Sequence, residues 1–320
     1  MSSLLNYFVV TKDMAPNVIR EEEIPIEALV RYEWSKRELR LPNISHEVEM
    51  PYDSSYVDKL LEVTRVRDEH NGCEVSLPVT SIYSPPPMLV YWYMEKIGVE
   101  VPYVDYDDED YGNHVHLVTY AEGMVKLYNT ILELLPWFAP FFAGYRRGFR
   151  YSIEEWASPE ARRLSSMYRV ERAYWAVTPN RRHMTPHVEI RMADSHPIES
   201  WAGAVLLTEY ASIIPLSPKN EASVRKDNYY AVLNNFSPDM KLRFKCIRKA
   251  PGVMESDGEY TIREVIMRVV DQVIDRFPKL TREIILRVTY NVLSERKVYY
   301  NGFMGLYGDL LSEVYPNVFD

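Results

Sequence analysis

Three segments of the chain alternate apolar and polar residues, and they constrain the fold more than any other feature of the sequence. They run over residues 44–50, 113–119 and 186–192, and a shorter segment over 73–77 repeats the pattern. Side chains of a β-strand point to opposite faces in turn, so the alternation predicts strands with one apolar and one polar face. The apolar faces need a core, which predicts a sheet that is covered on one side.

The polar faces of these strands carry groups that bind divalent cations or anions. The first strand places Glu47 and Glu49 on one face, and the second places His114 and His116 there. Carboxylate oxygens suit magnesium or manganese, imidazole is a borderline ligand, and a guanidinium group is a forked cation for phosphate or carboxylate. The polar faces of the other two strands carry His187, Glu189 and Arg191, and Glu74 and Ser76.

Two interpretations of this pattern stay open. If the strands are neighbours, the carboxylates and imidazoles converge in one pocket with an arginine beside them. Otherwise they are ordinary half-exposed strands whose polar faces meet water. Solvated strands usually carry Thr, Lys, Ser and Tyr rather than paired carboxylates on one strand and paired imidazoles on another, which favours the pocket.

Helical periodicity accounts for much of the remaining chain. Two amphipathic helices are predicted near 261–277 and 280–295, and their wide apolar faces fit either core packing or an oligomer interface. Strands interspersed with helices of varied length favour an α+β fold with a mostly antiparallel sheet. Further helices are predicted over residues 56–65, 88–97 (with Gly98 as its C-cap), 122–135, 153–170 and 198–213.

The most apolar stretch covers residues 127–144 and has about the minimum length of ~18 residues for a membrane span. It contains a glutamate and two prolines, so we expect a buried helix followed by a loop. The N-terminus lacks a basic region and a small-residue cleavage site, and Cys73 and Cys246 form neither a disulfide framework nor a zinc motif. We therefore expect a cytoplasmic protein without a membrane partner.

The charge balance restricts the possible partners. The 320 residues include 37 Lys+Arg and 46 Asp+Glu, which gives a formal net charge of −9. This balance argues against a nucleic-acid partner. An acidic protein also needs metal ions or a buried arginine cluster to hold an anionic substrate.

In their order along the chain, these motifs resemble the glutamine synthetase superfamily of carboxylate–amine ligases. The resemblance is closest to the glutamate–cysteine ligase and amidoligase branches, and it covers roughly residues 44–212. It implies a sheet with a charged concave face and with helices packed on the other side. The motifs are Glu47-Val-Glu49, Glu74-Val-Ser-Leu-Pro78, Asn113-His-Val-His-Leu117, Asn180-Arg181-Arg182, and Glu189-Ile-Arg191 followed by Asp194 and Pro197.

The resemblance also implies an activity and a site. It implies ATP-dependent activation of a carboxylate to an acyl phosphate and attack by an amine, with small-molecule acid and amine substrates. The cofactors would be ATP and Mg²⁺, with Mn²⁺ possible. Carried over by position, His116 and Arg191 would face the nucleotide phosphates, and Arg181 or Arg182 would hold the transferring phosphoryl group or acyl carboxylate. The metal ligands implied in this way are Glu47, Glu49, Glu74, His114 and Glu189.

The resemblance predicts a division of the chain, and the residues leave two other functions open. We expect an N-terminal segment of unclear role over 1–43, a ligase-like core over 44–215 and a helical part over 216–320. Rings are common among synthetase relatives, so a homo-oligomer is plausible. One alternative is a structural or binding protein that keeps the fold without turnover and assembles into oligomers. Another is a metal oxygenase or isomerase that uses His114, His116 and Glu189 as ligands.

Overall fold

The structure is a computed structural model of the 320-residue chain. The predicted segment 1–43 falls almost wholly outside the described residues, as does the predicted helix over 153–170. The described residues are 41–69, 72–99, 112–143, 177–180, 187–194, 197–214, 226–232, 236–244, 253 and 256–294.

A single antiparallel sheet of seven strands forms the centre of the described part of the chain. Its strands are β1 (Asn43–Met50), β2 (Arg65–Glu69), β3 (Gly72–Ser76), β4 (Thr80–Ser81), β5 (Gly112–Val118), β6 (Val177–Asn180) and β7 (His187–Asp194). Their order is β2-β3-β1-β5-β7-β6, and β4 pairs with one end of β1. All four of the alternating segments are therefore strands of one sheet, and β3, β1, β5 and β7 are consecutive neighbours.

Alternation along these strands separates an apolar face from a polar one, as the sequence predicts. The apolar residues of the central strands that are buried are at most 2% exposed and form the core. They include Ile44, Val48, Val75, Val115, Leu117, Val188 and Ile190.

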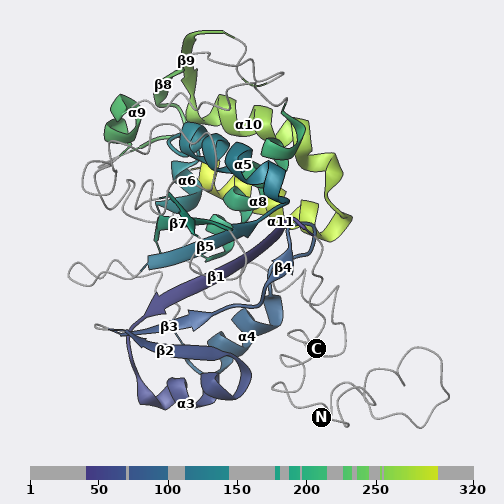
Figure 1. The fold of residues 1–320 in the computed structure, drawn as a ribbon. Coiled ribbons are helices and arrows are strands. Elements are labelled where there is room, and N and C mark those ends of the chain that lie inside the picture. Colours follow the sequence, from purple (N-terminus) through teal and green to yellow (C-terminus); the bar gives the residue numbers. More distant parts are fainter. Residues whose placement is uncertain are drawn as a thin grey trace, which may run out of the picture.

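Helices cover the apolar face of the sheet (Figure 1). Helix α8 (Pro197–Ile213) contacts β5 and β1, and α5 (Ala121–Leu134) contacts β6 and β7. Because α8 is apolar on all sides, it is a buried helix, and α10 (Ile262–Val273) and α11 (Lys279–Leu293) pack against it. The predicted α+β fold with an antiparallel sheet and packed helices is confirmed.

The sequence did not predict several of the elements. The helix predicted over 56–65 is α3 (Ser54–Val63), which starts earlier because the Asp53 side chain accepts a hydrogen bond from Ser55 N at 2.7 Å. Strand β2 begins at Arg65 and has one apolar residue in five, so it gives no alternation signal. Residues 216–320, which were predicted to be helical, also contain a hairpin of β8 (Lys241–Phe244) and β9 (Gly258–Thr261). Smaller elements are α4 (Met88–Lys96), α9 (Lys226–Ala231) and η4 (Ile274–Arg276), and Gly98 follows α4 with a φ of +81°.

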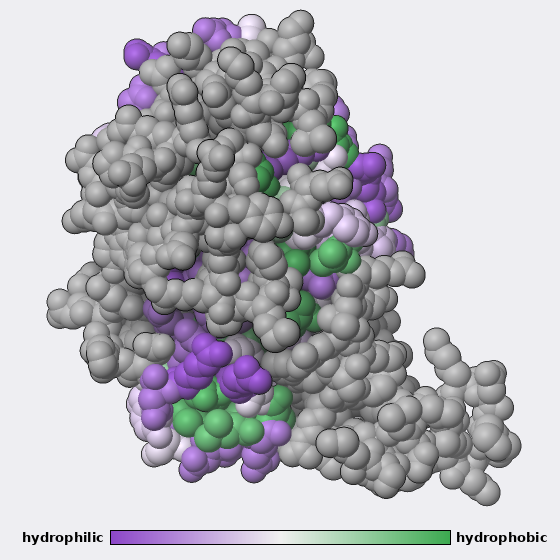
Figure 2. All heavy atoms as spheres, in the orientation of Figure 1, coloured by the Kyte–Doolittle hydropathy of each residue, from purple (hydrophilic) through white to green (hydrophobic). Residues whose placement is uncertain are grey.

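The described part of the apolar stretch, residues 127–143, is buried, and the loop predicted after its helix is a short turn followed by a second helix. A short helix, α6 (Ala139–Phe142), follows α5, and Pro140 lies in its first turn, where a missing N–H is tolerated. Among the described residues, no helix combines the length and the apolar character needed to cross a bilayer. On the face shown in Figure 2, hydrophilic residues border a small hydrophobic group at the α3 end, where Leu61 is 54% exposed.

Candidate metal centre

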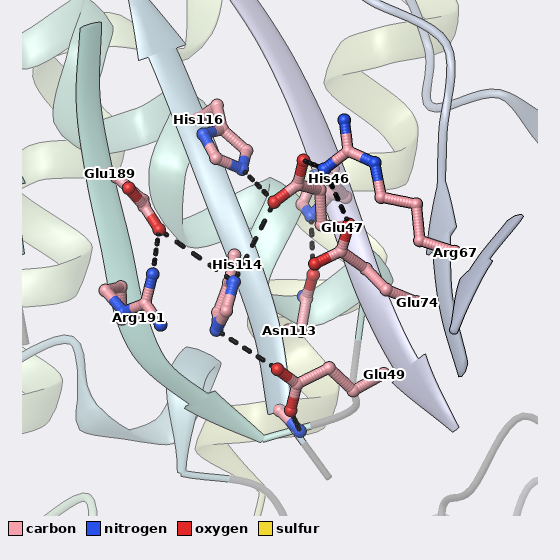
Figure 3. A network of polar contacts seen from close by, with 11 residues as sticks. His46, Glu47, Glu49, Arg67, Glu74, Asn113, His114, His116, Glu189 and Arg191 are labelled. Atoms are coloured by element: carbon pink, nitrogen blue, oxygen red, sulfur yellow. Dashed lines mark hydrogen bonds and ion pairs between the residues drawn. The ribbon is translucent and has the colours of Figure 1, made fainter. Parts of the chain in front are cut away.

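The strand register brings six of the predicted site residues and Arg191 together on the polar face of the sheet (Figure 3). Glu47 of β1 lies opposite His114 of β5, and His116 of β5 lies opposite Glu189 of β7. On the other side of β1, Glu49 lies opposite Glu74 of β3. Four neighbouring strands therefore each contribute at least one ligand-type side chain to the same surface.

One set of potential metal ligands consists of Glu47, Glu74 and His114. Each offers a donor atom, and these atoms all lie within 4.8 Å of one another. Glu49 borders this set, because its Oε1 lies 3.5 Å from His114 Nε2 and its Oε2 accepts a hydrogen bond from Gly112 N at 2.8 Å. Two carboxylates and one imidazole, with a third carboxylate beside them, form a donor set that suits a hard divalent cation.

A second set consists of His116, His187 and Glu189, whose donor atoms also lie within 4.8 Å of one another. The rings of the two histidines are 5.0 Å apart, centroid to centroid, and tilted by 60°. His187 and Glu189 are buried and alternate along β7, so both point to the polar face. This set contains two nitrogen donors and one carboxylate.

The two sets are adjacent and share contacts. Glu47 Oε2 lies 3.1 Å from His116 Nε2 and 3.9 Å from His114 Nδ1. From the second set, Glu189 Oε1 lies 3.8 Å from Nδ1 of His114 in the first set. Glu47 and Glu189 therefore each approach a histidine of the other set.

Two arginines neutralise part of the negative charge. Arg191 Nη1 donates to Glu189 Oε1 at 2.6 Å. Arg67 of β2 donates to Glu74 Oε1 at 3.2 Å and lies 3.6 Å from Glu47 Oε1. Both guanidinium groups are partly exposed, so they border the two ligand sets while they pair with carboxylates of these sets.

Imidazoles determine the protonation state of the central carboxylate. Burial alone would raise the pKa of Glu47, but hydrogen bonding and charge interaction with His114 and His116 outweigh it. The net effect holds the pKa of Glu47 well below its usual range. Glu47 is therefore an anion at neutral pH, which is the form that binds a cation.

A polar contact lies directly beneath this face, on the core side of β1 and β5. His46 Nδ1 is 3.1 Å from Asn113 Oδ1, and Asn113 Nδ2 donates to Ser200 Oγ of α8. Because the amide oxygen of Asn113 only accepts hydrogen bonds, His46 donates from Nδ1. Burial lowers the pKa of His46 to about 3, so the ring is neutral at neutral pH. This contact ties β1, β5 and α8 together under the ligand sets.

The structure places most of the sequence-predicted site residues and regroups them. Glu47, Glu74 and His114 lie together, whereas Glu189 groups with His116. The oxygenase or isomerase hypothesis joined His114, His116 and Glu189, but the donor atoms of the two histidines fall in different sets. The two other predicted residues, Arg181 and Arg182, lie outside the described residues.

Four further residues were not assigned to the site from the sequence. His187 shares a face with Glu189 two positions away, and that alternation was the signal for it. Arg67 lies on β2, which the sequence pattern does not reveal as a strand. His46 and Asn113 occupy core-side positions where alternation predicts apolar residues, so only their contact with each other identifies their role.

Comparisons with known proteins give limited information about this site. No protein family model and no curated protein matches the chain. Among solved structures, the chain is similar to a chain of the crystal structure of the complex between prokaryotic ubiquitin-like protein Pup and its ligase PafA. The TM-score is 0.39 at 9% sequence identity, with 87% of this chain and 66% of that chain covered. The chain thus spans just under two thirds of the length of that solved chain.

Proposed function

We propose that the chain is an ATP- and magnesium-dependent carboxylate–amine ligase that acts on a small amino-acid-like acid. The observation that carries this proposal is the pair of adjacent ligand sets on one sheet face, with arginines paired to their carboxylates. Phosphoryl transfer depends mainly on positioning and on neutralising charge, and this arrangement offers both. The order of the motifs along the chain supports the same class of reaction.

The residues present fit magnesium at the first set. Glu47, Glu74 and His114 would hold it, with Glu49 beside them, and manganese fits the same donors. Bound there, the ion would neutralise phosphate oxygens. The chain's own side chains would complete the site, with His116 and Arg191 contacting the nucleotide phosphates. The proposal extends to Arg181 or Arg182 as the holder of the transferring group.

The proposed reaction has two steps. A carboxylate oxygen of the acid attacks the γ-phosphorus of ATP, an O–P bond forms, and the bond to ADP breaks. The amine nitrogen then attacks the acyl carbon, the C–N bond forms, and inorganic phosphate leaves with the oxygen it gained. One proton leaves the amine.

Thermal-shift measurement with Mg·ATP tests the proposal. A ligand that binds the folded chain at 100 times its Kd stabilises it by about 2.7 kcal/mol, which gives a readily measured rise in Tm. Glu47→Ala and Arg191→Ala should reduce that rise strongly. Glu259→Ala and Arg243→Ala are matched controls, because these residues form an exposed pair 3.3 Å apart on the β8–β9 hairpin. Both controls should keep the wild-type shift.

Turnover separates the ligase from a non-catalytic relative. ADP release should require Mg·ATP, an acid and an amine together, and a panel of amino acids supplies both substrates. No Tm shift of the wild-type chain with Mg·ATP would reject the ligase proposal. Binding of Mg·ATP without ADP release across the panel would instead support a binding protein that keeps the fold.

A further inference from the structure

We propose that His116, His187 and Glu189 form a separate binding site for a divalent transition-metal ion of the zinc class. The site is chemically distinct from the carboxylate-rich set of Glu47 and Glu74. The inference does not rest on the ligase proposal, and it assigns His116 to a metal ion rather than to the nucleotide phosphates. Its donors come from only two strands, β5 and β7. The pairing of His116 with Glu189 and the alternation of His187 with Glu189 place all three on one surface.

The donor atoms determine which ion fits. Imidazole nitrogen suits zinc, copper, iron and nickel, whereas magnesium prefers oxygen and keeps several waters. Two histidines with one glutamate are a known donor set for zinc, and three protein ligands leave a position open for water or a substrate oxygen. The neighbouring set reverses this ratio, with two carboxylates and one imidazole. The two sets should therefore select different ions from the same solution.

The geometry requires only a small adjustment. Metal–ligand distances of about 2.1 Å in tetrahedral geometry place donor atoms about 3.4 Å apart. The three donor atoms already lie within 4.8 Å of one another, and the two rings are tilted by 60° rather than stacked. Rotation of the His116 and His187 side chains closes the remaining gap.

Burial strengthens the site. His187 is 6% exposed and Glu189 is 3% exposed, while the His116 side chain is 14% exposed and forms the open edge. Contacts also orient the donors: Arg191 donates to Glu189 at 2.6 Å, and Glu47 lies 3.1 Å from His116. Such outer contacts fix the direction of a metal ligand and typically affect metal affinity by about 10–100-fold.

Cobalt binding tests the proposal, because Co²⁺ occupies zinc sites and gives visible absorption bands that report nitrogen ligation. The full chain is stripped with a chelator and titrated with Co²⁺ in about 10 mM Mg²⁺, which saturates oxygen-rich sites. We expect a visible band that saturates at one Co²⁺ per chain and that Zn²⁺ removes. His187→Ala should weaken Co²⁺ binding at least about 100-fold, whereas the matched variant Glu74→Gln in the neighbouring set should change it less than about threefold.

A second variant guards against loss of folding. His187→Cys replaces one zinc ligand by another, so it should retain Co²⁺ and add a sulfur-to-cobalt charge-transfer band. Three results would overturn the proposal. The wild type shows no visible band, Mg²⁺ displaces the band, or the band is lost in Glu74→Gln but not in His187→Ala. Co²⁺ binding in a chain that shows no Tm shift with Mg·ATP would support this site and reject the ligase, so the two proposals fail separately.

Discussion

Replacing Glu199 by glutamine should change how stability depends on pH. Glu199 lies in the first turn of α8, which packs beneath β1 and β5, and it is 6% exposed. A helix N-terminus favours a negative charge, but here desolvation outweighs that effect. Burial raises the pKa of Glu199 from an ordinary 4.5 to about 7. The folded chain thus holds a proton on Glu199 over a pH range in which the unfolded chain has lost it.

The sign and size of the effect follow from proton linkage. Between pH 4.5 and 7 the folded state binds more protons than the unfolded state, so the free energy of unfolding falls as pH rises. At about 1.36 kcal/mol per pKa unit, the full loss is about 3 kcal/mol. The stability contribution is present below pH 4.5 and is lost as pH rises through 7. Glutamine is neutral throughout, so Glu199→Gln lacks this loss.

Chemical denaturation of both proteins at about pH 5 and about pH 8 measures the effect. The free energy of unfolding of Glu199→Gln relative to wild type should rise by roughly 2–3 kcal/mol between these values. Other groups, including His46, titrate in both proteins and cancel in the difference. A difference that stays constant with pH would refute the reasoning.

Replacing Glu264 by glutamine is a control, because it should change the pH dependence of stability in the opposite direction. Thr261 N and Thr261 Oγ1 donate to its carboxylate at 2.8 and 3.0 Å in the capping box of α10, and these hydrogen bonds lower the pKa of Glu264. A lowered pKa gives stability that is present above the unfolded value and is lost as pH falls. The stability of Glu264→Gln relative to wild type should therefore increase toward acid pH, whereas that of Glu199→Gln should decrease.

Two further predictions concern packing beneath the site. Gly203→Ala would place a Cβ 2.6 Å from Phe141 Cβ. We expect this variant to be destabilised, because overpacking costs about 1–3 kcal/mol and outweighs the gain of about 1 kcal/mol in helix propensity. A Cβ added at Gly123 meets only the Thr119 side chain, with Cγ2 at 3.3 Å, so Gly123→Ala should be neutral or stabilising in urea unfolding. If Gly203→Ala and Gly123→Ala were equally stable, this account would be contradicted. Asn113→Ala removes a hydrogen-bond partner of both His46 and Ser200, and it should lower the free energy of unfolding by about 1–3 kcal/mol in the same assay. A decrease below about 0.5 kcal/mol would show that this contact does not hold β1, β5 and α8 together.

Face membership was predictable from the sequence because it depends only on local alternation. Each of the four predicted strands places its polar side chains two residues apart, and this spacing holds whichever strand lies next to it. Glu47, His114 and Glu189 could therefore be assigned to polar faces without a structure. The same argument identified the covering helices, whose apolar periodicity is also a local property.

The grouping of ligands was not predictable, because it depends on register between strands. The pairing of β5 with β7 shifts between Asn113 and Val115, which moves His114 relative to β7. His116 thereby falls opposite Glu189, while His114 faces the carboxylates of β1 and β3. Nothing in the sequence of either strand marks that shift, so the sequence supplied the ligands but not the sets they form.

The register also bears on how a chain with a net charge of −9 would hold a phosphate. Four carboxylates of the polar face belong to the ligand sets or border them, and two arginines pair with carboxylates there: Arg191 with Glu189 and Arg67 with Glu74. A cation that binds these carboxylates competes with the guanidinium groups for the same oxygens. It thereby lowers the negative charge of the face and leaves the guanidinium donors to pair with phosphate. If the ligase proposal holds, metal and nucleotide binding are therefore coupled, and by linkage each strengthens the other by the same factor.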